Sequence, residues 1–168
     1  MTFSRDVARS STSLSSLDVP RVILVPAPAF PSLGSVLDGR PEPGTYVLLY
    51  GEGNGGVRRY VGASGRDVVH RAGSHLRPRA DGISAICLIV GGRAPMTPDE
   101  AFAYERLVHQ TLTEAGEKLG GGQPYGARLA SDHYDRLRAA TGALALALAD
   151  LGVVSGKVGA RALVAGPR

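Results

Sequence analysis

The sequence has almost none of the cysteine that secreted proteins and zinc-binding proteins use to stabilise their folds. It contains a single cysteine, Cys87, which excludes an internal disulfide and a zinc site built from several cysteines. Since Cys87 lies within an apolar run, we interpret it as a small buried hydrophobic residue. The sequence also lacks a G-x-S-x-G motif, which argues against an ordinary α/β hydrolase acting on a small substrate.

Long apolar runs are missing too. No stretch approaches the roughly 20 residues that a membrane-spanning helix needs, and the N-terminus has no secretory hydrophobic region. Residues 1–18 are rich in Ser and Arg and hold too little apolar content to order alone. Organellar transit peptides share this composition, but Asp6 and Asp18 argue against one. We therefore expect a flexible tail on a cytoplasmic protein that does not bind membranes.

The positive charge is concentrated in one part of the chain. From Arg58 to Arg93 the sequence has seven arginines against two aspartates, a net charge of +5, which leaves −1 for the rest of the chain. A surface that binds a polyanion needs such a concentration. The alternative interpretation is a set of ordinary surface arginines, from an organism whose proteins are generally rich in arginine.

The hydrophobic pattern predicts one domain with a core of its own. We expect strands at 22–25, 44–50, 57–62 and 84–90, helices at 66–76, 98–119 and 131–150, and an extended proline-rich connection over 26–43. The fold class is α/β in an α+β layout, with a small central mixed sheet flanked by helices. We divide the chain into a tail over 1–18, a module over 19–125, and a C-terminal helix and tail over 126–168 packed on that module.

The second helix has the clearest start signal in the sequence. Thr97 is the expected N-cap, Pro98 occupies the first helical position and Glu100 completes a capping box. Glu105 lies at the edge of the apolar stripe of this helix. That stripe is predicted to comprise Ala101, Tyr104, Val108, Thr111, Leu112, Ala115 and Leu119. We expect the three glycines at 120–122 to end the helix.

Candidate functional residues gather in the stretch from Gly44 to His75. Gly44-Thr45-Tyr46 and Tyr60-Val61-Gly62 fall on the two strands of a predicted hairpin. Period-2 alternation places Tyr46 on one face of the first strand, and Tyr60 shares a face with Gly62 on the second. The pairing of these faces would bring the two phenols together. Arg71 and His75 follow one turn apart on the next helix.

This stretch resembles the GIY-YIG nuclease family, over residues 44–122. The two tripeptides stand where the family has its name-giving motifs, and Arg71 and His75 match its helix-borne arginine and the histidine one turn later. The resemblance implies metal-dependent hydrolysis of nucleic-acid phosphodiester bonds, with DNA the expected substrate. It implies Tyr60 as the base and Tyr46 as its partner, with a 5′-phosphate and a 3′-hydroxyl as products.

Phosphodiester chemistry assigns roles to the remaining residues. Arg71 offers a forked cationic donor for phosphate oxygens, and His75 would contact the phosphate or assist a tyrosine. Glu105 can hold one hard divalent cation, Mg²⁺ or Mn²⁺. For substrate binding we expect Gly62 together with Arg58, Arg59, Arg66 and Arg77. No second DNA-binding domain is visible, so specificity would depend on a homodimer, a partner protein or the shape of the substrate.

Each residue also has an ordinary structural explanation. Tyr46 and Tyr60 would serve equally as strand aromatics. Arg71 could pair with Asp67, a surface pair of about 0.3–0.5 kcal/mol. Glu105 could pair with an arginine, and Gly62 could simply permit close packing.

The sequence departs from the family pattern in ways that keep a rival hypothesis open. The hairpin turn is long, and the late asparagine of many members is absent, with Gln123 the nearest substitute. The rival is a non-catalytic nucleic-acid-binding or protein-interaction module on the same fold. A separate alternative pairs Glu105 with His109 as a two-ligand metal site.

Overall fold

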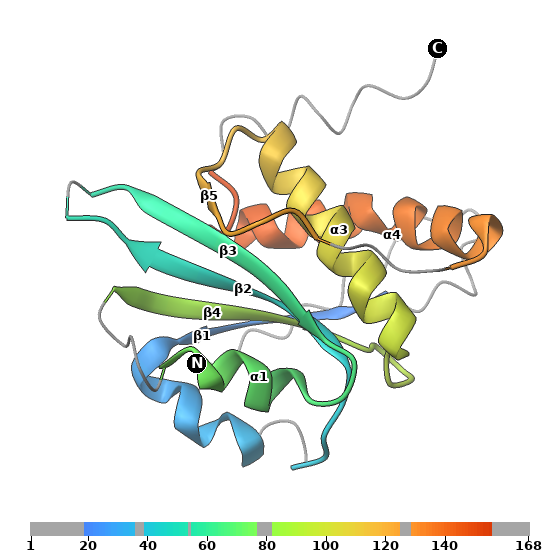
Figure 1. Cartoon of the computed structure of the whole chain (residues 1–168), viewed down its shortest axis with the longest axis horizontal. Coiled ribbons are helices and arrows are strands. Elements are labelled where there is room, and N and C mark those ends of the chain that lie inside the picture. The colour runs from blue at the N-terminus through green and yellow to red at the C-terminus, as the bar shows by residue number, and fades with distance from the viewer. Residues whose placement is uncertain (1–18, 36–38, 54, 77–81, 125–128, 156–168) are drawn as a thin grey trace.

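The computed structural model describes residues 19–35, 39–53, 55–76, 82–124 and 129–155. Five strands form one sheet in the order β1-β4-β2-β3-β5 (Figure 1). The strands are β1 (Arg21–Pro26), β2 (Gly44–Gly51), β3 (Val57–Ser64), β4 (Ile83–Val90) and β5 (Leu119–Gly120). The helices are η1 (Ala27–Ser35), α1 (Val68–Ser74), α3 (Pro98–Glu114) and α4 (Ser131–Asp150).

The sheet is mixed, as the sequence predicts. β1 pairs antiparallel with β4, β4 with β2, and β2 with β3. The two-residue β5 runs parallel to β3 and pairs with its residues Arg59 and Tyr60. The expected hairpin is therefore the centre of the sheet, and the strand predicted at 84–90 lies beside it.

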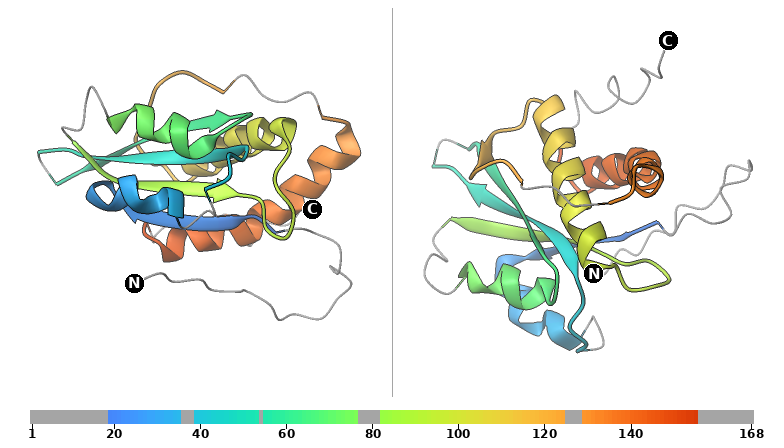
Figure 2. Two further views of the ribbon diagram at one scale, coloured as in Figure 1. Left: turned by 90° about the horizontal axis from the view of Figure 1, so that it is seen from below. Right: turned by 45° about the vertical axis from the view of Figure 1, so that its right-hand side comes forward.

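Helices cover both faces of this sheet (Figures 1 and 2). One face, with Val47 and Val61, packs in a common core with residues of α3 and α4. The other face, with Tyr46, Leu48 and Tyr60, packs with residues of η1 and α1. Strand alternation decides which side chain goes to which core, so the two candidate tyrosines lie on the η1–α1 side.

The start of α3 is confirmed and its predicted end is wrong. Thr97 caps the helix and forms the capping box with Glu100. The helix ends at Glu114 instead of residue 119, because Gly116 adopts φ +74°, a conformation that terminates helices. Leu119 and Gly120 then form β5. Ala103 and Leu107, outside the predicted stripe, are buried as well.

Two other predictions need correction. The proline-rich connection is not extended throughout, since Ala27–Ser35 forms the 3₁₀ helix η1; the φ that proline fixes suits this conformation. Phe30 of η1 is buried against Gly73 of α1. The first helix is shorter than predicted: it begins at Val68, because the Asp67 side chain caps it by accepting from the His70 N–H at 2.9 Å, and it ends at Ser74.

The C-terminal helix shares the core of the preceding module. α4 has the predicted bounds and ends before Gly152, whose φ is +72°. Leu137, Leu144 and Leu148 are buried in the cluster that also contains Val47 and Val61. The tails predicted over 1–18 and after α4 lie outside the described residues, except for residues 151–155. Among the helices that the structure describes, none is long and apolar enough to cross a membrane.

Candidate functional site

The floor of the candidate site is the pair of tyrosines on β2 and β3. Tyr46 lies opposite Gly62, and Leu48 lies opposite Tyr60. The two phenol rings therefore lie on one face, with centroids 6.3 Å apart and planes tilted by 33°. The sequence prediction that the hairpin brings Tyr46 and Tyr60 together is confirmed.

Two glycines make room for these rings. A Cβ on Gly62 would lie 2.5 Å from Tyr46 Cζ, so only glycine lets the Tyr46 ring cross β3 at this point. A Cβ on Gly121 would lie 2.7 Å from Tyr60 Cε2, and Gly121 also has φ +90°, a conformation that glycine adopts without strain. Sequence reasoning missed this role because it treated the glycines at 120–122 only as a helix stop.

Helix α1 brings His75 and Arg71 to the tyrosines. The Tyr46 hydroxyl is hydrogen-bonded to His75 Nε2 at 2.9 Å. The His75 ring lies 5.6 Å from the Tyr46 ring and 5.4 Å from the Tyr60 ring. Asp67 is engaged in capping α1, and no ion pair within the described part of the chain joins it to Arg71. The surface-pair explanation of Arg71 therefore finds no support.

The environment sets the protonation of Tyr46 and His75. Burial raises the pKa of Tyr46 well above its ordinary value, Tyr60 and Glu105 add to the rise, and Arg71 opposes it. Burial, aided by the Arg71 charge, lowers the pKa of His75. At neutral pH the phenol is therefore protonated and the imidazole neutral. A neutral Nε2 can accept the proton that the Tyr46 hydroxyl donates.

Glu105 completes the set from α3. Its side chain is half-buried, and burial raises the pKa of its carboxyl. Glu105 is close enough for its charge to act on Tyr46, yet it makes no hydrogen bond or ion pair with any residue that the structure describes. A half-buried carboxylate in this position fits a hard divalent cation, which would keep several waters.

A closed metal cage is not present around Glu105. His109 follows one turn later on the same helix, but the described residues contain no group of three or more His, Cys, Asp or Glu side chains that could hold a metal. The protein would therefore supply one carboxylate, with His109 as a further candidate ligand.

The arginines expected to bind substrate divide into two groups. Arg58, Arg66 and Arg71 are exposed, and none takes part in the ion pairs of the described residues. Arg58 stands over the Tyr50 ring, 5.4 Å from its centroid. These three remain candidates for phosphate contacts. Arg77 lies outside the described residues.

Arg59 does not fit the substrate-binding role predicted for it. Alternation turns it to the α3–α4 face, where its side chain is only 6% exposed and forms a 2.6 Å ion pair with the equally buried Glu117. Its guanidinium also donates to Val57 O at 2.8 Å and Val153 O at 2.7 Å. Arg59 thus connects β3 to Glu117, which follows α3, and to Val153, which follows α4. The prediction is wrong because it ignored the alternation of side chains along the strand.

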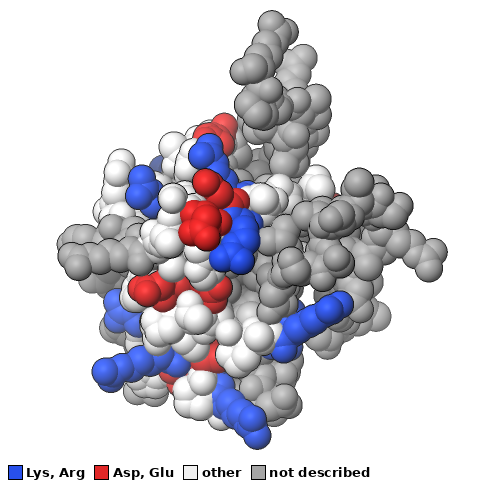
Figure 3. Space-filling view, turned by 90° about the vertical axis from the view of Figure 1, so that its right-hand side faces the viewer, with Lys and Arg blue, Asp and Glu red and all other residues white. Residues whose placement is uncertain are grey.

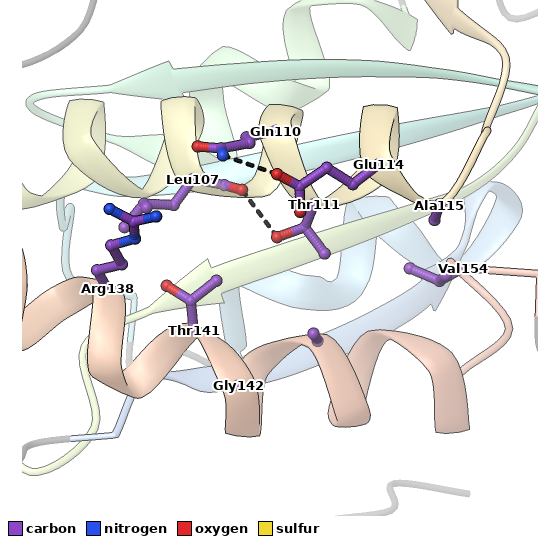
Figure 4. A pocket seen from close by; sticks show the side chains of 10 residues that line it. Leu107, Gln110, Thr111, Glu114, Ala115, Arg138, Thr141, Gly142 and Val154 are labelled. Atoms are coloured by element: carbon purple, nitrogen blue, oxygen red, sulfur yellow. Dashed lines mark hydrogen bonds between the residues drawn. The ribbon is translucent and has the colours of Figure 1, made fainter. Parts of the chain in front are cut away.

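Among the described residues, two surfaces away from the tyrosines do not offer a comparable arrangement. The side of the molecule at the right of Figure 1 carries acidic side chains directly beside basic ones (Figure 3). A hollow of about 190 Å³ between α3 and α4 is lined by apolar and polar side chains, and several of the polar ones bond within their own helix, such as Gln110 to Glu114 (Figure 4). Neither surface combines a base, a cation and a free carboxylate.

Comparison with known proteins adds no further identification. No protein-family model matches the chain, and neither the curated proteins nor the solved structures searched give a significant match.

Proposed function

We propose that this protein is a metal-dependent endonuclease of the GIY-YIG type, which hydrolyses phosphodiester bonds in nucleic acid, with DNA the expected substrate. The observation that carries the proposal is the 2.9 Å hydrogen bond between the Tyr46 hydroxyl and His75 Nε2. It couples a phenol to a neutral base, beside the exposed Arg71 and the carboxylate of Glu105, which has no hydrogen-bond or ion-pair partner among the described residues. Hydrolysis of a phosphodiester needs these groups together.

The geometry favours Tyr46 rather than Tyr60 as the group that takes the proton from water. A phenol with a raised pKa ionises too rarely to act alone. His75 can accept the Tyr46 proton while the Tyr46 oxygen receives one from the attacking water, so no free phenolate is needed. Tyr60, whose ring lies beside both, would position the water. This assignment exchanges the roles that the sequence resemblance implied.

The other two residues would manage charge. Arg71 is exposed at this site and can place its forked donors on phosphate oxygens. Glu105 would hold the divalent cation, Mg²⁺ or Mn²⁺, which when bound supplies positive charge for the phosphate and the departing oxygen. Attack in line with the leaving oxygen would give a 5′-phosphate and a 3′-hydroxyl.

The test is a cleavage assay with labelled single strands, duplexes, branched junctions and RNA in Mg²⁺, Mn²⁺ or EDTA. Tyr46→Phe removes a proton-transfer group, so we expect the cleavage rate to fall about 10²–10⁴-fold. Glu105→Gln should abolish the metal dependence together with the activity. Tyr134→Phe and Glu114→Gln, on α4 and the exposed side of α3, are matched controls and should cleave normally.

Two results would overturn the proposal. Cleavage that survives in both Tyr46→Phe and Glu105→Gln would place the activity elsewhere or in a contaminant. Salt-sensitive binding without cleavage of any substrate, lost in Arg71→Ala, would instead support a non-catalytic nucleic-acid-binding module.

A further inference from the structure

An aromatic ring is exposed at the edge of the candidate site. Phe102 is 37% exposed and precedes Glu105 by three positions on α3, so both side chains leave the same face of the helix. That face adjoins the chain just after β3. A Cβ on Gly65 would lie 3.3 Å from Phe102 Cε2 and 3.2 Å from Pro98 Cβ. One edge of the Phe102 ring is therefore supported by the loop, while part of the ring is left open to solvent.

A cation is held in place at the other end of β3. Arg58 lies on the same face of the strand as Tyr60, with its guanidinium above the Tyr50 ring. On its other side the Arg58 stem packs on Gly120 of β5, where an added Cβ would lie 3.3 Å from Cδ. Contacts on both sides restrict the side chain, and no ion pair of the described residues occupies its charge. Such an arginine is ready to receive a phosphate.

These two features lie at opposite ends of the tyrosine pair. Arg58 and Ser64 stand six positions apart on β3, a span of about 20 Å at ~3.3 Å per residue. Tyr60 lies between them, and Phe102 adjoins the residue that follows Ser64. A nucleic-acid strand that crosses the site along β3 would therefore meet the Arg58 cation first, then the two tyrosines, and then the Phe102 ring.

We propose that the nucleic acid is unpaired where it crosses this site, with one base stacked on Phe102 and a backbone phosphate on Arg58. This inference rests on the proposed function and narrows its substrate class to single strands or single-stranded segments of branched molecules. Aromatic rings that alternate with cations are the common surface for unpaired strands. A base within a duplex is covered on both faces by its neighbours, so Phe102 cannot reach it.

Phe102 and Arg58 should contribute differently to the choice between single-stranded and duplex nucleic acid. Loss of the Phe102 ring should weaken binding of unpaired strands and leave duplex binding unchanged. Loss of the Arg58 charge should weaken binding of both, because both present phosphates. Arg138, exposed on α4 away from the tyrosine face, supplies a control for charge. Leu146, 54% exposed on α4, supplies a control for an exposed apolar side chain.

The experiment measures binding of fluorescein-labelled DNA by anisotropy in EDTA, so that it does not depend on cleavage. The probes are a single strand and a duplex of the same sequence. We expect Phe102→Leu to raise the Kd for the single strand about tenfold and to leave the duplex Kd unchanged, with Phe102→Tyr restoring the wild-type value. Arg58→Ala should raise the Kd for both probes. Leu146→Ala and Arg138→Ala should change neither Kd.

A second readout detects stacking directly. A single strand that carries 5-iodouracil should form a photocrosslink to Phe102, identified by mass spectrometry and lost in Phe102→Leu. The inference would be overturned if Phe102→Leu raised the Kd for the single strand and the duplex equally. It would also be overturned if single-strand binding and crosslinking by this variant were identical to wild type. Cleavage of a fully paired duplex by the wild-type protein as fast as the single strand would also overturn the inference, and it would leave the proposed nuclease standing. Selective binding of the single strand without metal-dependent cleavage would overturn the proposed nuclease and leave the binding surface standing.

Discussion

The buried ion pair between Arg59 and Glu117 makes a prediction that depends on no assumption about function. The change is Glu117→Gln, which keeps the shape of the side chain and removes its charge. Both side chains are nearly inaccessible, at 6% and 5% exposure, and their charged atoms lie 2.6 Å apart. Water therefore cannot screen the guanidinium that is left behind. Loss of one partner of a buried pair typically costs about 3–5 kcal/mol.

The contacts that survive place the expected cost at the low end of that range. Arg59 still donates to Val57 O and Val153 O, so about 3 kcal/mol of unfolding free energy should be lost. For a domain of this length that corresponds to a fall in Tm of roughly 6–12 °C. The assay is urea unfolding followed by circular dichroism, with Glu114→Gln, an exposed glutamate near the end of α3, as the control that should stay within about 0.5 kcal/mol.

The double replacement tests the reason rather than the size of the effect. Arg59→Met combined with Glu117→Leu removes both charges, and apolar substitutes for a buried pair are often neutral or stabilising. We expect this variant to recover most of the stability that Glu117→Gln loses. A loss below 1 kcal/mol for Glu117→Gln, or a double variant less stable than the single one, would refute the argument that an uncompensated buried charge is responsible.

Two further predictions concern the tyrosine pair. Gly62→Ala should lose about 1–3 kcal/mol of stability and the cleavage activity with it, because its Cβ would overlap the Tyr46 ring, whereas Gly53→Ala, with nothing within 4 Å, should lose neither; equal effects of the two would contradict this reading of the packing. The lowered pKa of His75 means that the folded state favours the neutral ring, so its contribution to stability is present above pH 6.5 and is lost as the pH falls through the lowered pKa; cleavage should show an acid limb below pH 6.5 that disappears, with most of the rate, in His75→Gln.

Local patterns were enough to predict the centre of the fold. Strand alternation together with the expected hairpin pairing predicted that Tyr46 and Tyr60 share a face, and helical spacing placed His75 one turn after Arg71. These relations depend on residues that are close in sequence or joined by one hairpin, so the periods of strand and helix determine them. The capping box at Thr97 is local in the same sense, and it correctly located the start of α3.

Long-range pairing explains what sequence reasoning missed. Gly121 reaches Tyr60 only because β5 pairs with β3, and two residues of strand leave no periodic signal. Arg59 looked like a partner for nucleic acid because its neighbours are basic, although parity already turned it away from Tyr60. Phe102 had a detectable signal, an apolar residue on the helix face of Glu105, but its exposure could be seen only once the loop at Gly65 was placed.

The bond from Arg59 to Val153 has a consequence for the order in which this protein is made. The two residues are 94 positions apart, which at 5–20 residues per second is about 5–20 s of ribosomal synthesis. Until the end of α4 has emerged, β3 carries a guanidinium whose acceptor at Val153 does not yet exist. The strand that bears Tyr60 therefore gains this hydrogen bond only when nearly the last described part of the chain has left the ribosome. A prematurely released fragment would contain both tyrosines but lack the bond from Arg59 to Val153 that holds β3 in place.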